Sequence, residues 1–379
     1  MMMSSSHHHR SIPTEDRVSN LPDSILSHIL SFLPTKSSAA TSVLSKRWET
    51  LWLSLFDLDD LDGRQSFKDF INFLPRCQPH EATDTIIPCI NEIIIDAAFQ
   101  RGTQTLDLHK VYRPKDQLKL TRRIFTCRTL TFLKLKNLCV NDLPFLPNIP
   151  LLKTLHLENV YFTTQTHIFK LLLACPNLEE LQIIHVIVLP PKNKAAFDEH
   201  LPRLARLVRA TVSDDNLPIP FSLLSGVQIL NVKSIWHIYI QLPTFQNLTQ
   251  MEIFFANFKG RSWRDKWNWT LEMLQHTPKL QDLTIHEDMK DAICEDNWHD
   301  PQVVPECLSS QLRTLLFRDC IGRQCELQFL KYVMRNSMVL HSVTIHSANS
   351  INFNAKYQML LKLVTFRRGS RACRLKFHR

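Results

Sequence analysis

The feature of this sequence that most constrains its fold is a short motif that places apolar residues at its first, fourth and sixth positions. It occurs at residues 90–95, 130–135, 152–157, 178–183, 227–232, 248–253, 280–285, 312–317 and 340–345. After residue 130 most copies start twenty-one to thirty-two residues apart, and Leu204 and Leu207 form a degenerate copy in the widest gap. Recurrence at such a period is the sequence signature of a repeat protein.

Each repeat is expected to supply one strand and, in several repeats, a helix. Alternate motif residues share one face of a strand, whereas Ile168, Leu171 and Leu172 have helical spacing. A single unit of this size cannot bury its apolar face, so neighbouring units must stack. We therefore predict an α/β fold in which parallel strands line the concave side of a curved solenoid and helices cover the other side.

The period and the motif resemble leucine-rich repeats in an irregular form. The resemblance covers roughly residues 85–345, and an asparagine stands near the place typical of such repeats at Asn137 and Asn159 only. It implies a parallel sheet with one strand per repeat and a binding surface built from exposed side chains.

The segment 16–60 has the pattern of a small helical module. Pro22 suits the first turn of a helix and Asp23 complements its dipole, so a helix should begin at Leu21 or Pro22 and end at Pro34. Its apolar residues cover two adjacent stripes instead of one. One stripe can pack inside the module, and the second requires a partner.

A second helix capped by Thr35 and a third beginning at Ser45 should complete this module, with Trp48 and Trp52 one helical turn apart. The ordered set resembles an F-box, the three-helix module that docks onto the Skp adaptor of cullin-based ubiquitin ligases. Some plant proteins combine an F-box with leucine-rich repeats. The resemblance implies that the adaptor is bound by Leu21, Pro22, Ile25, Leu26, Ile29, Leu30, Leu33, Pro34, Lys46, Arg47, Trp48 and Trp52.

Three segments near the end, 298–301, 304–312 and 369–377, resemble the FBD domain of plant F-box proteins. In the last segment apolar and basic residues alternate, as expected of a half-buried terminal strand with Cys373, Leu375 and Phe377 inward and Arg374, Lys376 and His378 outward. We expect this strand to cap the solenoid, with its charges protecting an open sheet edge. A localisation or nucleic-acid patch is the alternative for these basic residues.

The predicted organisation is a disordered tail over 1–15, an F-box over 16–60, irregular leucine-rich repeats over 61–295 and an FBD region over 296–379. No apolar run is long enough to cross a membrane, and no membrane association is expected. Ten cysteines without a CxxC pair are typical of reduced, mostly buried thiols. We expect an intracellular protein of the nucleus, the cytoplasm or both.

Catalytic signals are weak. None of the six glycines belongs to a phosphate-binding loop, and Cys320, Cys325, His299 and His346 lack the spacing of zinc ligands. We predict a non-enzyme without a metal or an obligatory cofactor.

The formal charge of +9 raises the question of an anionic ligand. Trp267, Leu271 and Leu274 have helical core spacing, whereas Trp263 and its basic neighbours are expected in a loop. Some plant hormone-receptor F-box proteins hold an inositol phosphate on a basic solenoid surface, and the candidate residues here are Lys259, Arg261, Arg264 and Lys266. A solvated basic loop is the alternative.

The resemblances together imply the substrate-recognition subunit of an SCF-type ubiquitin ligase. The F-box would bind the Skp adaptor and through it a cullin, and the solenoid would bind a target protein of unknown identity. Ubiquitin transfer would use other subunits, and this chain would supply proximity. A Skp-bound adaptor without a degradative role and a nucleic-acid-binding repeat protein are the alternatives; we expect no nucleic-acid ligand.

Overall fold

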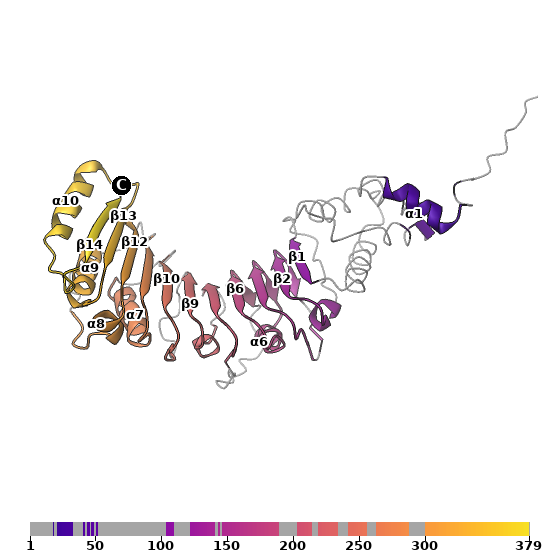
Figure 1. The fold of residues 1–379 in the computed structure, drawn as a ribbon, viewed down its shortest axis with the longest axis horizontal. Coiled ribbons are helices and arrows are strands. Elements are labelled where there is room, and N and C mark those ends of the chain that lie inside the picture. The colour runs from indigo at the N-terminus through magenta and orange to yellow at the C-terminus, as the bar shows by residue number, and fades with distance from the viewer. Residues whose placement is uncertain are drawn as a thin grey trace, which may run out of the picture. The chain divides into compact units, whose positions relative to one another are not determined.

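The computed structural model describes residues 18, 21–32, 41, 44–45, 47–48, 51, 104–109, 122–140, 143–144, 146–188, 203–213, 219–233, 242–255, 263–287 and 300–378 (Figure 1). The chain divides into two compact units, Met1–Gln100 and Arg101–Arg379. None of the described helices has the length and apolar character that crossing a bilayer requires. The predicted tail and the motif at 90–95 lie outside the described residues.

The first unit contains the helix α1 (Asp23–Ser31), which Pro22 precedes as its N-cap residue. This agrees within one residue with the predicted start. Leu26 and Leu30 are buried one turn apart, so one of the two predicted apolar stripes packs inside the unit. Trp48 is also buried and lies in helical backbone.

In the second unit the described strands form one large parallel sheet in which spatial order follows chain order. Its strands are β1 (Thr105–His109), β2 (Phe132–Lys136), β4 (Thr154–Glu158), β6 (Glu180–Ile184), β8 (Arg209–Ser213), β9 (Ile229–Lys233), β10 (Gln250–Phe255), β11 (Asp282–Glu287), β12 (Thr314–Cys320), β13 (Ser342–Ser347) and β14 (Arg374–His378). Every adjacent pair is parallel. A second sheet is formed by β3 (Cys139–Val140), β5 (Tyr161–Phe162) and β7 (Ile187–Val188).

The apolar motif explains this sheet. Its fourth and sixth residues, such as Leu133 and Leu135 in β2, are buried on one face, and the residues between them face the other side. All other described motifs end in a strand. The degenerate copy is shifted by three residues from the predicted one: Leu204 and Leu207 precede β8, and the spacing that enters the strand is that of Leu207, Ala210 and Val212. The α/β class and the parallel repeat sheet are therefore confirmed, and the three-helix form of the first module stays a prediction. The strand β1 and the second sheet were not predicted.

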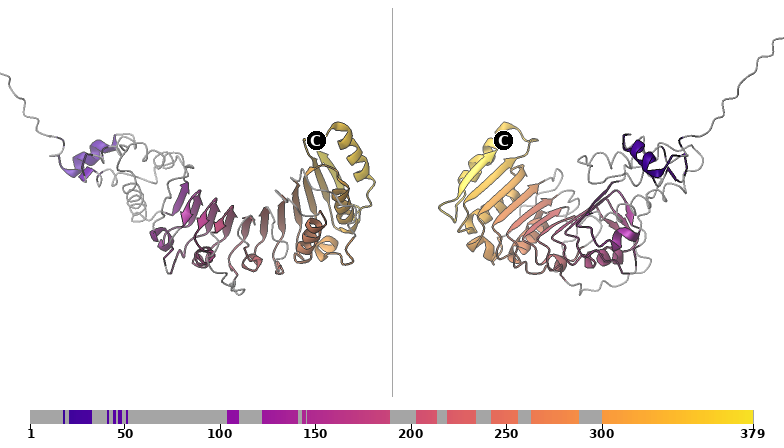
Figure 2. Two further views of the ribbon diagram at one scale, coloured as in Figure 1. Left: turned by 180° about the vertical axis from the view of Figure 1, so that it is seen from behind. Right: turned by 45° about the vertical axis from the view of Figure 1, so that its right-hand side comes forward.

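Helices cover the buried face of the sheet. They are η3 (Arg122–Thr126), α6 (Gln165–Leu173), η4 (Phe221–Leu224), α7 (Trp263–Gln275), α8 (Glu306–Ser310), α9 (Gln324–Asn336) and α10 (Phe353–Val364), of which η3 and η4 are 3₁₀ helices. Figures 1 and 2 show α6, α7 and α8 along the same side of the second unit, with the sheet bending around its opposite, open face. The helical spacing at Ile168 predicted α6 correctly.

The core continues without a break into the C-terminal region. The ring of Trp267 in α7 stacks on Phe329 in α9, with ring centroids 4.2 Å apart, and also contacts Phe317 in β12. The terminal strand β14 pairs with β13 and follows the predicted alternation, because Leu375 and Phe377 are half-buried between exposed basic residues. Trp267 is a core residue, as its helical spacing predicted.

Candidate partner-binding surfaces

The first candidate surface is the outer stripe of α1. Ile25, Ile29 and Phe32 follow one another at helical spacing and are 45%, 42% and 75% exposed. Exposed apolar residues that line up on one helix mark an interaction site more often than scattered ones do. This is the second stripe for which the sequence required a partner.

Arg47 fixes the start of this helix. Its guanidinium donates to the Asp23 carboxylate, with Nε to Oδ1 at 2.8 Å and Nη2 to Oδ1 at 2.6 Å, and Nη2 also donates to the Leu21 carbonyl at 2.6 Å. Two donors directed at one carboxylate hold the pair in a defined geometry. Arg47 therefore positions the segment Leu21–Pro22, which lies at the end of the stripe.

The structure divides the predicted adaptor-binding residues into three groups. Pro22, Ile25, Ile29 and Arg47 are exposed, and Leu21 is half-buried. The buried side chains Leu26, Leu30 and Trp48 are placed to support the surface rather than to contact a partner. The remaining residues, Leu33, Pro34, Lys46 and Trp52, lie outside the described residues. Their roles in binding stay predictions.

The predicted anion site needs one correction. Lys266 lies inside helix α7 and is fully buried, where its ammonium group donates to Glu287 Oε2 and faces the rings of Phe255 and Trp267. The surface loop that the basic run predicts is wrong at Lys266, because α7 already begins at Trp263. A solvent anion has no access to Lys266. Arg264 is exposed, and Lys259 and Arg261 lie outside the described residues.

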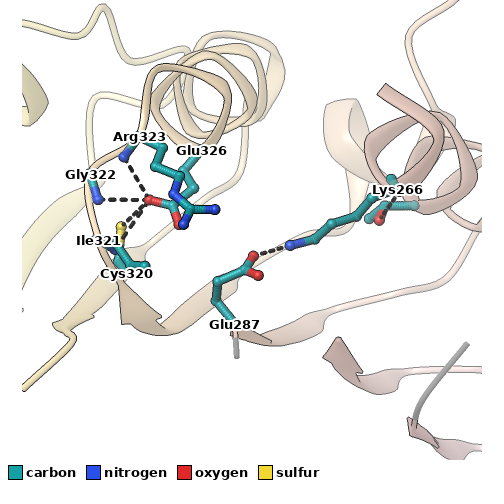
Figure 3. A network of polar contacts seen from close by, with 8 residues as sticks. Lys266, Glu287, Cys320, Ile321, Gly322, Arg323 and Glu326 are labelled. Carbon is teal, nitrogen blue, oxygen red and sulfur yellow. Dashed lines mark hydrogen bonds and ion pairs between the residues drawn. The ribbon is translucent and has the colours of Figure 1, made fainter. Parts of the chain in front are cut away.

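Lys266 belongs instead to a buried polar network that joins the repeats to the C-terminal region (Figure 3). Glu326, in the first turn of α9, accepts through Oε2 from the backbone N–H groups of Ile321, Gly322 and Arg323 at 3.2, 2.7 and 2.9 Å. Backbone donors at a helix start stabilise a carboxylate.

Burial governs the protonation of this network. It lowers the pKa of Lys266 well below its usual value, and the Glu326 carboxylate opposes this effect. Burial raises the pKa of Glu326, whereas Lys266 and the backbone N–H groups hold it down. The second oxygens of Glu287 and Glu326 accept no hydrogen bond within the part of the chain that the structure describes. The Lys266–Glu287 ion pair links α7 to β11, and the Glu326 carboxylate of α9 acts on Lys266 through its charge, so these buried groups do not form a surface site.

The described cysteines behave as predicted from their scatter. They are free thiols, and all but the half-buried Cys139 are buried. Burial raises the pKa of Cys175 and of Cys307 to about 12, so both thiols stay protonated near neutral pH and are poor nucleophiles. Among the described residues no group of three or more His, Cys, Asp or Glu side chains is arranged to hold a metal ion.

The second candidate surface is the open face of the large sheet. Over β1 to β8 its cations are paired with carboxylates on neighbouring strands. The pairs are Lys134 with Asp107 at 3.6 Å, Lys136 with Glu158 at 2.5 Å, and Arg209 with Glu180 at 3.2 Å. This half of the face is therefore largely neutralised by its own side chains.

Over β9 to β14 the open face carries a row of cationic and aromatic side chains near the carboxyl ends of the strands. We name this row the cation–aromatic ladder; it consists of Lys233, Phe254, His286, Arg318, His346 and His378. Strand register places Phe254 beside both Lys233 and His286, and His346 beside His378. Phe254 and His286 stack with ring centroids 3.9 Å apart, and the two other rings stack at 4.7 Å.

Sequence reasoning missed this ladder, although a signal for it exists. Lys233, Phe254, His286, Arg318 and His346 each stand directly after the sixth residue of a repeat motif. Aligning the motifs therefore places these side chains in one row on the outward face of the sheet.

Family comparisons match three parts of the chain. Residues 18–58 match the F-box domain, residues 93–195 match the family described as "FBD-associated F-box protein At5g56370, LRR repeats", and residues 300–345 match FBD. The F-box/FBD/LRR-repeat protein At3g26920 of Arabidopsis thaliana is 30% identical over 438 residues, which cover 97% of this chain and 98% of the relative. This chain belongs to the F-box/FBD/LRR-repeat family.

Other members of the F-box/FBD/LRR-repeat family align over nearly the whole chain. The FBD-associated F-box protein At5g56370 of the same plant is 28% identical over 424 residues, with 96% of this chain and all of the relative covered. The matches confirm the resemblances to F-box, leucine-rich-repeat and FBD sequences. The exact domain boundaries at 15, 60 and 295 stay predictions.

Proposed function

We propose that this F-box/FBD/LRR-repeat protein is the substrate-recognition subunit of an SCF-type ubiquitin ligase. Its F-box binds a Skp-type adaptor, which links it to a cullin, and its repeat sheet binds a target protein. The chain itself performs no chemistry in this role, because it brings the target close to a ubiquitin donor held by other subunits. Such a subunit acts in the nucleus or the cytoplasm.

The observation that carries this proposal is the outer stripe of α1 within the segment that matches the F-box domain. Ile25, Ile29 and Phe32 are exposed although the same helix buries Leu26 and Leu30. Burying large apolar side chains against a partner contributes about 1.5 to 3 kcal/mol for each residue that becomes fully covered. The exposed stripe is thus suited to a hydrophobic contact with the adaptor.

Charge substitutions in the stripe test adaptor binding. Replacing Ile25→Glu and Ile29→Glu together should abolish co-purification of the full chain with a Skp-type adaptor, because two carboxylates would be desolvated in an apolar interface. The fold should survive, since both side chains are exposed. Co-purification from cells that express both proteins, with circular dichroism of the variant, measures the two effects.

A matched control adds the same two charges elsewhere. Leu146→Glu with Val303→Glu alters exposed apolar residues of the second unit and should leave adaptor binding unchanged. Adaptor binding by the Ile25/Ile29 variant at the unmodified level would contradict the proposed role of the stripe. Reconstitution with a cullin, a conjugating enzyme and ubiquitin then distinguishes a ligase subunit from an adaptor that never recruits a cullin.

A further inference from the structure

We infer that the cation–aromatic ladder is the docking site for an acidic segment, rich in aspartate and glutamate, of the target protein. This inference rests on the proposed function, because it gives the chemical class of the target segment. Its basis is an asymmetry of charge along the open face of the sheet.

The first step is the contrast between the two halves of this face. In the strands β1 to β8 the outward lysines and arginines form ion pairs across neighbouring strands. In β9 to β14, Lys233, Arg318, Arg374 and Lys376 point outward, and no acidic side chain among the described residues lies within ion-pair distance of them. Uncompensated cations on one surface attract an anionic partner.

The second step concerns the carboxylates that are present. Glu252 accepts from His286 Nε2 at 2.6 Å, and Asp282 accepts from the Thr314 hydroxyl. Asp319, in the irregular part of β12, raises the pKa of His346, whereas burial and the charges of His378 and Arg318 lower it more strongly. Glu252 and Asp282 are thus hydrogen-bonded to neighbours other than the lysines and arginines of the surface, and Asp319 forms no ion pair with a described residue.

The third step separates a protein segment from a nucleic acid. Binding of single strands relies on aromatic rings whose faces are open for bases to stack. In the ladder Phe254 is flanked by Lys233, whose Nζ lies 5.1 Å from the ring centroid, and by the stacked ring of His286. These contacts occupy the Phe254 ring on both flanks. The ring therefore holds its neighbours in place and does not offer an open face on which a base could stack. Carboxylates, which need charge and hydrogen-bond donors only, fit this surface better.

Direct binding of a defined probe tests the inference. The probe is a fluorescent glutamate-rich peptide of about ten residues, long enough to span the ladder in an extended form, and its binding to the full chain is followed by anisotropy. Replacing Lys233→Gln and Arg318→Gln together should weaken binding at least about tenfold, because both carry uncompensated charge. A peptide with glutamine in place of glutamate should not bind.

The control removes the same charge from the neutralised half of the sheet. Lys136→Gln with Arg209→Gln should change peptide affinity by about twofold or less, because both cations already have carboxylate partners. Equal loss in both variants, or binding of the glutamine peptide as tight as that of the glutamate peptide, would overturn the inference. Tighter binding of single-stranded DNA through Lys233 and Arg318 would also overturn it.

The two proposals can fail separately. Co-purification with a Skp-type adaptor should be the same for the Lys233/Arg318 variant and the unmodified chain. If the adaptor binds and the peptide does not, the acidic-segment inference fails and the proposed function stands. If the peptide binds and the adaptor does not, the ladder is confirmed as a peptide site and the ligase role fails.

Discussion

At the scale of single residues, three turns show how the residue that follows a strand adopts the backbone conformation that the repeat requires. Asn137, Asn159 and His185 each follow a strand and adopt left-handed backbone conformations, with φ of 56°, 51° and 50°. Asparagine tolerates this region better than most residues. The backbone N–H groups of Asn137 and Asn159 donate to the carbonyls of Glu158 and Ile184, both at 3.0 Å, which ties these two turns to the next repeat.

The two asparagines also contact each other. Asn159 Nδ2 donates to Asn137 Oδ1 at 3.0 Å. Asn159→Asp should lower the free energy of unfolding by about 1 to 2 kcal/mol, because a carboxylate cannot donate to this acceptor and would repel it. Urea denaturation followed by circular dichroism measures the change.

Asn231→Asp is the matched control. Asn231 Nδ2 donates to the Thr211 hydroxyl at 3.3 Å, and that hydroxyl can rotate and donate to a carboxylate instead. This variant should lose less stability than Asn159→Asp. An equal or larger loss at Asn231 would mean that the direction of the Asn159 hydrogen bond does not matter.

At the scale of helices and strands, the sequence was most informative where apolar spacing alone decides the structure. The motif predicted the strands, and Ile168 and Trp267 predicted their helices, because burial depends on position along the element. The loop expected at Lys266 is wrong because the same basic composition is compatible with a loop and with the first turn of a helix. Its pairing with Glu287 depends on contacts between distant segments, which sequence spacing does not contain.

The buried pair of Lys266 and Glu287 permits a prediction at this scale. Lys266→Met should destabilise the second unit by about 3 to 5 kcal/mol, because it leaves Glu287 buried without its cationic partner. Adding Glu287→Leu should restore part of this stability, since the unpaired charge is then absent. Urea denaturation of both variants measures the difference, and a double variant less stable than the single one would contradict the pairing.

At the scale of the whole molecule, the C-terminal region completes the sheet that the repeats begin. The sheet passes from β11 to β12 without a change of direction, and Phe317 and Phe329 of this region pack against Trp267. A chain that ends after residue 287 would expose both an apolar helix face and the edge of β11. Such an edge recruits other chains.

Truncation tests this dependence. A chain of residues 1–287 should aggregate, whereas residues 101–379, which keep the complete second unit, should stay monomeric. Size-exclusion chromatography with light scattering measures both. Monomeric behaviour of the chain 1–287 would show that the repeats need no contribution from the residues after 287.

The length of the ladder also determines how many residues a target segment needs to contact all of it. Its six side chains lie on successive strands, which are about 4.8 Å apart, so the row spans about 24 Å. An extended chain covers this distance with about seven residues, whereas a helix needs about sixteen. A target that contacts the whole row with few residues must therefore present an unfolded acidic stretch, such as a tail or a long loop. Recognition of this kind selects targets by a local segment and leaves their folded domains, and the lysines on them, free to move.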